Sequence, residues 1–151
     1  MTLYLLPDAA KTDQARNEAA IMTAAAPRIV LVERDRHVCA LITLFLKRVG
    51  YEVDVVDTGY LGLDRVRRLG SAIVITEILV TALDGLALCR LLKTDPTLQV
   101  GVIVLSMLSA ANRACQAGAD AFLMKPIDEE SLINTVNEVA LKLSVESRST
   151  P

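Results

Sequence analysis

The sequence predicts an α/β domain in which a parallel sheet of five strands carries helices on both faces. Five short runs of β-branched and other apolar residues alternate with segments whose apolar residues recur at helical spacing. Continuous apolar strands are typical of parallel sheets buried on both faces, and their alternation with helices indicates β-α-β connections. The length of 151 residues suits one domain, and a hydrophobic content of 52% excludes a disordered chain.

The expected elements follow one another in a regular order. Strands are predicted at residues 28–32, 51–56, 72–75, 100–105 and 121–124, and helices near 38–49, 61–69, 86–92, 110–117 and 132–143. Gly50, Gly70 and Gly118 close three of the helices, because glycine readily adopts the left-handed conformation at a helix end. The third helix is expected to stop before Asp95-Pro96, and Asp128 is expected to cap the last one.

Three segments differ in composition. Residues 1–27 are rich in Ala, Asn, Gln and Asp and form an N-terminal extension, either a weakly amphipathic helix or a mobile tail. Residues 28–143 form the domain. Residues 144–151 are polar and are expected to form a C-terminal tail.

Composition excludes several classes of function. A net charge of −2 gives no electrostatic footprint for nucleic acid or an anionic membrane. No apolar run reaches the ~18–20 residues of a membrane helix, and the first ten residues lack the basic flank of a secretory signal. Cys39, Cys89 and Cys115 form no CxxC pair, which argues against a zinc site or a disulfide framework. We expect three buried thiols in a reducing cytoplasm.

Polar and charged residues follow four of the expected strands. Glu33 and Arg34 come after the first strand, Glu77 after the third, Ser106 after the fourth and Lys125 after the fifth. The carboxyl ends of parallel strands lie at one edge of the sheet, where ligands of such folds bind. The sequence therefore predicts that these five side chains converge. Neither a GxGxxG nor a P-loop motif accompanies them, so a nucleotide site is not indicated.

The stretches IVLVERD, ITEILVTALDG, VIVLS and AGADAFLMKP give the chain from residue 28 to 143 a likeness to a known family. This part resembles the receiver domain of two-component response regulators. The resemblance implies a doubly wound, flavodoxin-like (βα)5 fold of strand order 2-1-3-4-5. It also implies a site where working members hold Mg²⁺ on an acidic pair and a phospho-accepting Asp, while a Ser or Thr and a Lys bind the phosphoryl group.

The sequence departs from the family at this site. Glu33 matches the first acid, but Arg34 stands in place of the second acid and Glu77 in place of the acceptor Asp; Ser106 and Lys125 match their family positions. Two carboxylates and two cations leave no net charge to attract a dication, and a guanidinium is expected to fill its room. We therefore expect a degenerate "pseudo-receiver" without bound Mg²⁺.

Two interpretations of Glu77 remain open. In the first, Glu77 mimics a phosphorylated acceptor by pairing with Lys125 and hydrogen-bonding to Ser106. In the second, which we favour, Glu77 forms a structural ion pair with Arg34. Phe122 occupies the family's switch-like aromatic position, and we expect it to serve packing because it lacks a hydroxyl group.

We interpret the chain as a stand-alone, non-enzymatic module of a bacterial signalling pathway, since only eight residues follow Leu143. It is expected to bind a protein partner through the fourth helix, fifth strand and fifth helix, although the segment from Ser106 to Lys125 is shorter than the family usually has. No nucleic acid, membrane or small-molecule substrate is expected. The alternatives are a conventional phosphoryl-accepting response regulator and, less favoured, a small Ser106–Lys125 hydrolase, for which no nucleophile elbow is visible.

Overall fold

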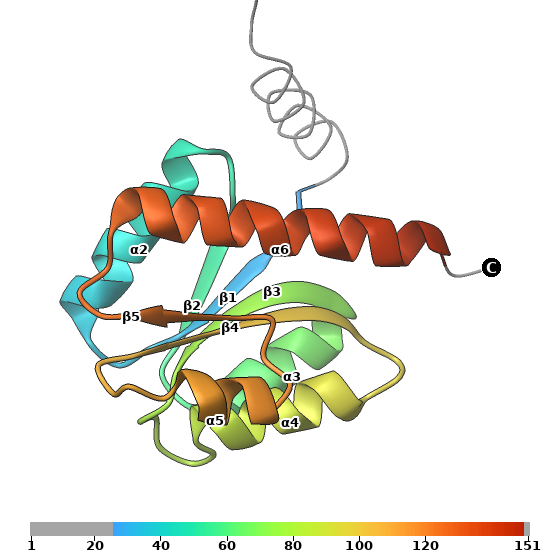
Figure 1. Ribbon diagram of the computed structural model, residues 1–151, viewed down its shortest axis with the longest axis horizontal. Helices are drawn as coiled ribbons and strands as arrows, with labels where there is room; N and C mark the ends of the chain where they lie inside the picture. The colour runs from blue at the N-terminus through green and yellow to red at the C-terminus, as the bar shows by residue number, and fades with distance from the viewer. Residues whose placement is uncertain (1–25, 150–151) are drawn as a thin grey trace, which may run out of the picture.

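A parallel sheet of strand order β2-β1-β3-β4-β5 forms the centre of the structure, a computed structural model that describes residues 26–149 (Figure 1). All four strand pairings are parallel. The strands are β1 (Ile29–Val32), β2 (Val53–Val56), β3 (Ser71–Glu77), β4 (Gln99–Ser106) and β5 (Ala121–Met124). The doubly wound, flavodoxin-like fold and its strand order are confirmed.

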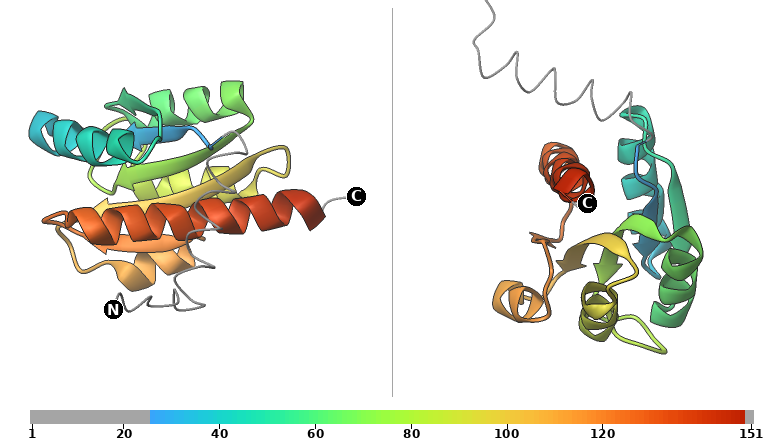
Figure 2. Two further views of the ribbon diagram at one scale, coloured as in Figure 1. Left: turned by 90° about the horizontal axis from the view of Figure 1, so that it is seen from above. Right: turned by 90° about the vertical axis from the view of Figure 1, so that its right-hand side faces the viewer.

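Helices cover both faces of the sheet (Figure 2). On one face lie α2 (Arg36–Arg48) and α6 (Glu129–Ser149). On the other lie α3 (Gly59–Leu69), α4 (Gly85–Thr94) and α5 (Ala111–Gln116). A helix after each strand carries the chain back, so that all strands point the same way and their carboxyl ends share one edge.

The central strands are buried on both sides. In β1, Val30 and Val32 pack toward α3 and α4, whereas Ile29 and Leu31 pack toward α2 and α6. Alternate residues of a strand point to opposite faces, so a strand between two helical layers is apolar throughout. This explains the uninterrupted apolar runs in the sequence.

Polar side chains cap the helices as their positions predict. The Asp128 carboxylate accepts a hydrogen bond from the backbone N–H of Ser131 at 3.0 Å at the start of α6. Gly70 ends α3 with φ of 76°, in the left-handed region that favours glycine. These predicted boundaries are confirmed.

The expectation of a polar C-terminal tail is wrong, because α6 continues to Ser149 and runs past the strands (Figure 1). No glycine or proline interrupts residues 144–149. Gly101 of β4 allows α6 to pack closely, since a Cβ there would lie 2.2 Å from the Val139 side chain. Residues 1–25 of the expected extension, and residues 150 and 151, lie outside the described residues.

The three cysteines occupy different environments. Cys89 is buried, Cys39 half-buried and Cys115 exposed, and all three are free thiols. The expectation of three buried thiols is therefore wrong for Cys39 and Cys115. Burial raises the pKa of the Cys89 thiol to about 11. Across residues 26–149, no helix combines the length and apolar character needed to cross a bilayer.

Candidate functional site at the carboxyl ends of the strands

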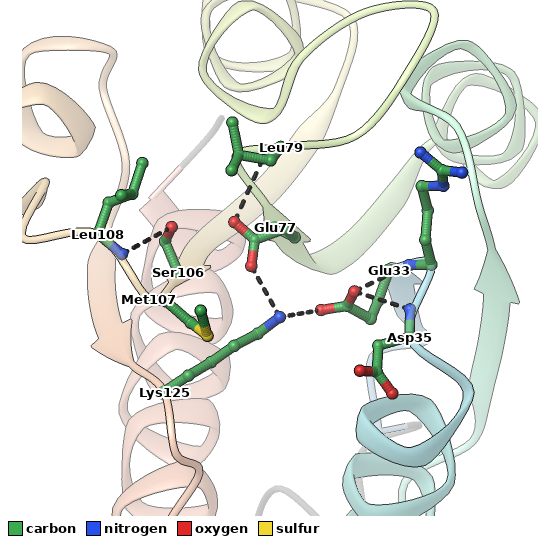
Figure 3. Close-up of a pocket in the computed structure, with 9 residues that line it drawn as sticks. Glu33, Asp35, Glu77, Leu79, Ser106, Met107, Leu108 and Lys125 are labelled. Atoms are coloured by element: carbon green, nitrogen blue, oxygen red, sulfur yellow. Dashed lines mark hydrogen bonds and ion pairs between the residues drawn. The ribbon is translucent and has the colours of Figure 1, made fainter.

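The polar residues predicted to converge do so around one open pocket of about 450 Å³ (Figure 3). Its position at the carboxyl edge of β1, β3 and β4 is the place where ligand sites form in this type of sheet. The residues that line it are Glu33, Arg34, Asp35, Glu77, Leu79, Ser106, Met107, Leu108 and Lys125.

Lys125 occupies the centre of the site. Its Nζ lies 2.6 Å from an oxygen of Glu33 and 2.7 Å from an oxygen of Glu77, so one ammonium group bridges two carboxylates (Figure 3). The three side chains are only 13%, 4% and 9% exposed, respectively. We call these three residues the carboxyl-end cluster.

The remaining oxygen of Glu33 is bound by the chain that follows β1. Glu33 Oε1 accepts hydrogen bonds from the backbone N–H groups of Arg34 at 2.9 Å and Asp35 at 3.0 Å. Glu33 Oε2 accepts from Lys125. Both carboxylate oxygens therefore have partners, which compensates for burying the charge.

Glu77 repeats this arrangement at the end of β3. Its Oε1 accepts from the N–H groups of Ile78 at 2.8 Å and Leu79 at 3.2 Å, while Oε2 pairs with Lys125. A hydrogen bond with the Ser106 side chain also favours the charged form. Each carboxylate thus has one oxygen on backbone amides and one on the shared ammonium.

Opposing effects set the pKa values of Glu77 and Lys125. Burial is the largest influence on the pKa of Glu77 and raises it, but hydrogen bonds from Lys125, Leu79 and Ser106 together hold this pKa below its ordinary value. Burial likewise lowers the pKa of Lys125, but the hydrogen bonds and charges of both glutamates outweigh it and raise this pKa. Glu77 and Lys125 are therefore both charged at neutral pH.

Arg34 does not take the place expected for it. Its side chain is exposed, and the ion pairs between described residues include none from Arg34 to Glu77. The favoured interpretation of Glu77 as an ion-pair partner of Arg34 is wrong, because the Lys125 ammonium at the end of β5 pairs with both carboxylates. The cation that fills this space is Lys125 rather than Arg34.

The donor set does not fit a magnesium ion. Mg²⁺ prefers near-octahedral oxygen ligands, whereas the facing oxygens of Glu33 and Glu77 both contact Lys125. Asp35 instead caps α2, with its carboxylate accepting from the N–H groups of His37 and Val38 at 2.8 and 3.2 Å. In the described chain, no group of three or more His, Cys, Asp or Glu side chains could hold a metal ion.

Ser106 and Phe122 complete the neighbourhood. The hydroxyl oxygen of Ser106 accepts from the N–H of Leu108 at 3.2 Å, which folds the chain that leaves β4 back toward the site. Phe122 is half-buried and packs against the core beneath α3, α4 and α5.

The sequence analysis missed the apolar part of the pocket. Leu79, Met107 and Leu108 are exposed and lie directly after β3 and β4. Large apolar residues in the loops that follow two strands were a visible signal, because loops at such an edge are usually polar.

The doubly wound sheet carries two carboxylates, a serine and a lysine at the carboxyl ends of its strands. This arrangement defines an α/β signalling fold of the receiver type. A family model of the response regulator receiver domain matches residues 29–137. The chain belongs to this family, and the predicted resemblance is confirmed.

Several curated relatives are longer transcriptional regulators. The transcriptional regulatory protein CseB of Streptomyces avermitilis is 31% identical over 114 residues, which cover 74% of this chain and 48% of CseB. The DNA-binding response regulator MtrA of Mycobacterium tuberculosis is 25% identical, over 72% of this chain and 48% of MtrA. The chain spans about half the length of these relatives.

Solved receiver domains are similar over nearly their whole length. The signal receiver domain of a signal transduction histidine kinase from Syntrophus aciditrophicus is 31% identical, with a TM-score of 0.68; the match covers 83% of this chain and 96% of that domain. A response regulator receiver domain protein from Clostridium thermocellum has a TM-score of 0.72 at 22% identity, covering 80% of this chain and 98% of that protein, and supports the fold alone.

Proposed function

We propose that this receiver domain acts in bacterial signalling by protein interaction, without needing Mg²⁺ or aspartyl phosphorylation. The observation that carries the proposal is the Lys125 ammonium between Glu33 and Glu77, at 2.6 and 2.7 Å. A dication bound to these carboxylates would have to displace Lys125 and break two buried ion pairs. Breaking such pairs is costly, because it leaves charges buried without partners.

The position and contacts of Glu77 also disfavour phosphoryl transfer. Its Oε1 accepts two backbone hydrogen bonds and its Oε2 is paired with Lys125. Phosphoryl transfer needs an attacking oxygen that is free to align with the donor and a cation that neutralises the phosphate. Neither requirement is met by this arrangement.

The contacts favour the mimicry interpretation of Glu77. Lys125 and Ser106, which bind the phosphoryl group in the family resemblance, both contact this carboxylate. We propose that Glu77 holds them where a phosphorylated acceptor would, so that the domain stays in one signalling state. Its output would then depend on partner availability.

The contacts give no support to the hydrolase alternative. A catalytic Lys must release a proton near neutral pH, whereas its two carboxylate partners raise the pKa of Lys125. The Ser106 hydroxyl is engaged by Leu108 N–H and by Glu77.

Labelling by acetyl phosphate with Mg²⁺, read by intact mass, tests the proposal. We expect no label on the wild type, on Glu77→Asp or on Arg34→Asp, because each single variant keeps one defect. The double variant restores a third carboxylate and an acceptor of shorter length. We expect it to be partially labelled, to a greater extent than the sum of the labelling of the two single variants. Ready labelling of the wild type would place the conventional phosphoryl-accepting response regulator first.

A further inference from the structure

The last turns of α6 carry apolar side chains on two faces. Val139 and Leu143 face the sheet, where a Cβ at Gly101 would lie 2.2 and 3.5 Å from their side chains. Leu141 and Val145 instead are 36% and 55% exposed. Residues four apart lie on one face of a helix, so Leu141 and Val145 form a stripe that points away from the sheet. We call these two residues the apolar stripe.

The apolar stripe has no neighbouring helix among residues 26–149. Helix α2 lies beside the beginning of α6, where Arg48 pairs with Glu129, but α2 ends at Arg48 and α6 runs on past it (Figure 2). The inner face of α6 is fixed by its close packing at Gly101. The helix therefore cannot turn to bury the apolar stripe without losing that contact.

The chain enters the domain beside this part of α6. Ala26 is half-buried and packs against the same core cluster as Leu143, and Figures 1 and 2 show the start of β1, in blue, alongside α6. Among residues 1–25, the large apolar residues nearest to Ala26 are Ile21 and Met22. Four or five residues span at most about 13–18 Å, more than the ~10–12 Å diameter of a helix, so both residues can reach the outer face of α6.

We propose that residues 1–25, the N-terminal segment, fold back on the last turns of α6. Ile21 and Met22 of this segment cover the apolar stripe. The contact shields an apolar helix end that another chain could otherwise bind. It is independent of the phosphorylation-independent function proposed above, because it involves neither the carboxyl-end cluster nor its pocket.

The size of the apolar stripe favours the chain's own segment as its occupant. A separate protein needs an interface of about 1,200–2,000 Å² to bind stably, whereas the stripe consists of two side chains. A segment tethered at Ala26 is present at an effective concentration on the order of mM. A contact of a few apolar side chains is then sufficient to hold it.

Amide hydrogen exchange of the full chain tests the contact. An uncovered helix end opens readily, so residues 140–149 should exchange at least about tenfold faster in Ile21→Asp/Met22→Asp than in the wild type. Thr12→Asp/Gln14→Asp adds the same charge to the polar middle of the segment. It is the matched control and should leave these rates unchanged. The amides of β3 report on the fold and should exchange equally in all three proteins.

An engineered disulfide tests the proximity directly. Cys115→Ser first removes the exposed native thiol. In this background, Met22→Cys/Val145→Cys is expected to form a disulfide within one chain on mild oxidation, read by intact mass and non-reducing electrophoresis. Met22→Cys/Leu91→Cys is the matched control, because Leu91 is exposed on α4, on the other face of the sheet. This pair should remain reduced.

Three results would overturn the inference. The first is exchange at residues 140–149 that Ile21→Asp/Met22→Asp does not change, and the second is equal disulfide formation by the two cysteine pairs. The third is a disulfide found only between chains, together with protection of α6 that rises with protein concentration. This third result would make a second copy of the chain the occupant of the apolar stripe.

Discussion

Strand β5 lies between two ion clusters of opposite composition. At its carboxyl end, the cation Lys125 joins two anions, Glu33 and Glu77. At its amino end, the anion Asp120 joins two cations: Asp120 lies 2.9 Å from Lys93 Nζ and 2.5 Å from Lys142 Nζ. We call the second group the amino-end cluster.

The two clusters differ in how their outer charges meet water. Both glutamates of the carboxyl-end cluster are less than 10% exposed, whereas the Lys93 and Lys142 side chains are 24% and 55% exposed. A long lysine can keep its head in water when its partner is lost, but a short buried carboxylate cannot. The comparison suggests that the amino-end cluster fastens the fold, while the carboxyl-end cluster depends on its central cation.

The largest expected effect comes from removing that cation. Lys125→Met leaves two buried carboxylates facing each other, and we expect a loss of about 3 kcal/mol of unfolding free energy at neutral pH. Urea denaturation measures it. A triple variant that also carries Glu33→Gln and Glu77→Gln removes the stranded charges and should recover much of the loss. A loss below about 1 kcal/mol for Lys125→Met would mean that water reaches the glutamates freely.

The corresponding change at the other end should cost less. Asp120→Asn removes the central anion, but Lys93 and Lys142 can turn toward solvent and the Asn oxygen can still accept from the N–H of Val102, now bound at 2.8 Å. We expect a loss of about 1–2 kcal/mol in the same urea experiment. Asp64→Asn, which breaks an exposed pair with Arg68, is the matched control and should change stability little. A larger loss for Asp120→Asn than for Lys125→Met would reverse the comparison.

The pH dependence of unfolding should show how much the ionised Glu77 side chain contributes to stability. Because the folded pKa of Glu77 lies below its ordinary value of 4.5, its stabilising contribution is present above pH 4.5 and is lost as the pH falls through the folded value. Lys125 shows the opposite sign: its contribution is present below pH 10.5 and is lost as the pH rises through its raised pKa. The difference in unfolding free energy between wild type and Glu77→Gln should therefore shrink on acidification. A difference that is constant from neutral pH to below pH 4 would contradict the pairing.

The comparison also shows which features of the structure could be predicted from the sequence. The strand order was implied by the resemblance to receiver domains. Helix ends and the meeting of Glu33, Glu77, Ser106 and Lys125 were predictable from the residues themselves, because apolar periodicity marks the elements and parallel topology brings strand ends to one edge. The choice between Arg34 and Lys125 as the partner of Glu77 could not be predicted. It depends on the direction in which each side chain leaves its strand, which charge counting does not give.

Two other features lay beyond the sequence for similar reasons. The close packing of α6 against β4 depends on Gly101, a contact between residues far apart in the chain. Asp120 was not singled out, although its position within the motif AGADAFLMKP and directly before a strand was visible. Its partners come from α4 and α6, on opposite faces of the sheet, and only the fold brings them together.

The smallest expected effects concern the two lysines of the amino-end cluster. They test whether solvent exposure alone determines how much each lysine contributes to stability. Lys93 donates to the backbone oxygen of Val100 at 3.0 Å as well as to Asp120, and its side chain is the less exposed of the two lysines. Lys93→Gln should therefore cost about 1 kcal/mol, since it breaks a charge-assisted hydrogen bond to a carboxylate that is only 4% exposed. Lys142→Gln removes a half-exposed partner, and surface pairs of this kind contribute about 0–1 kcal/mol, so we expect no more than about 0.5 kcal/mol. Urea denaturation in low and in high salt measures the loss of unfolding free energy for both variants. Only the loss for Lys142→Gln should become smaller as the salt concentration rises. Equal losses that both resist salt would show that Lys142 fastens α6 to Asp120 as firmly as Lys93 fastens α4, and that solvent exposure does not explain the difference between the two clusters.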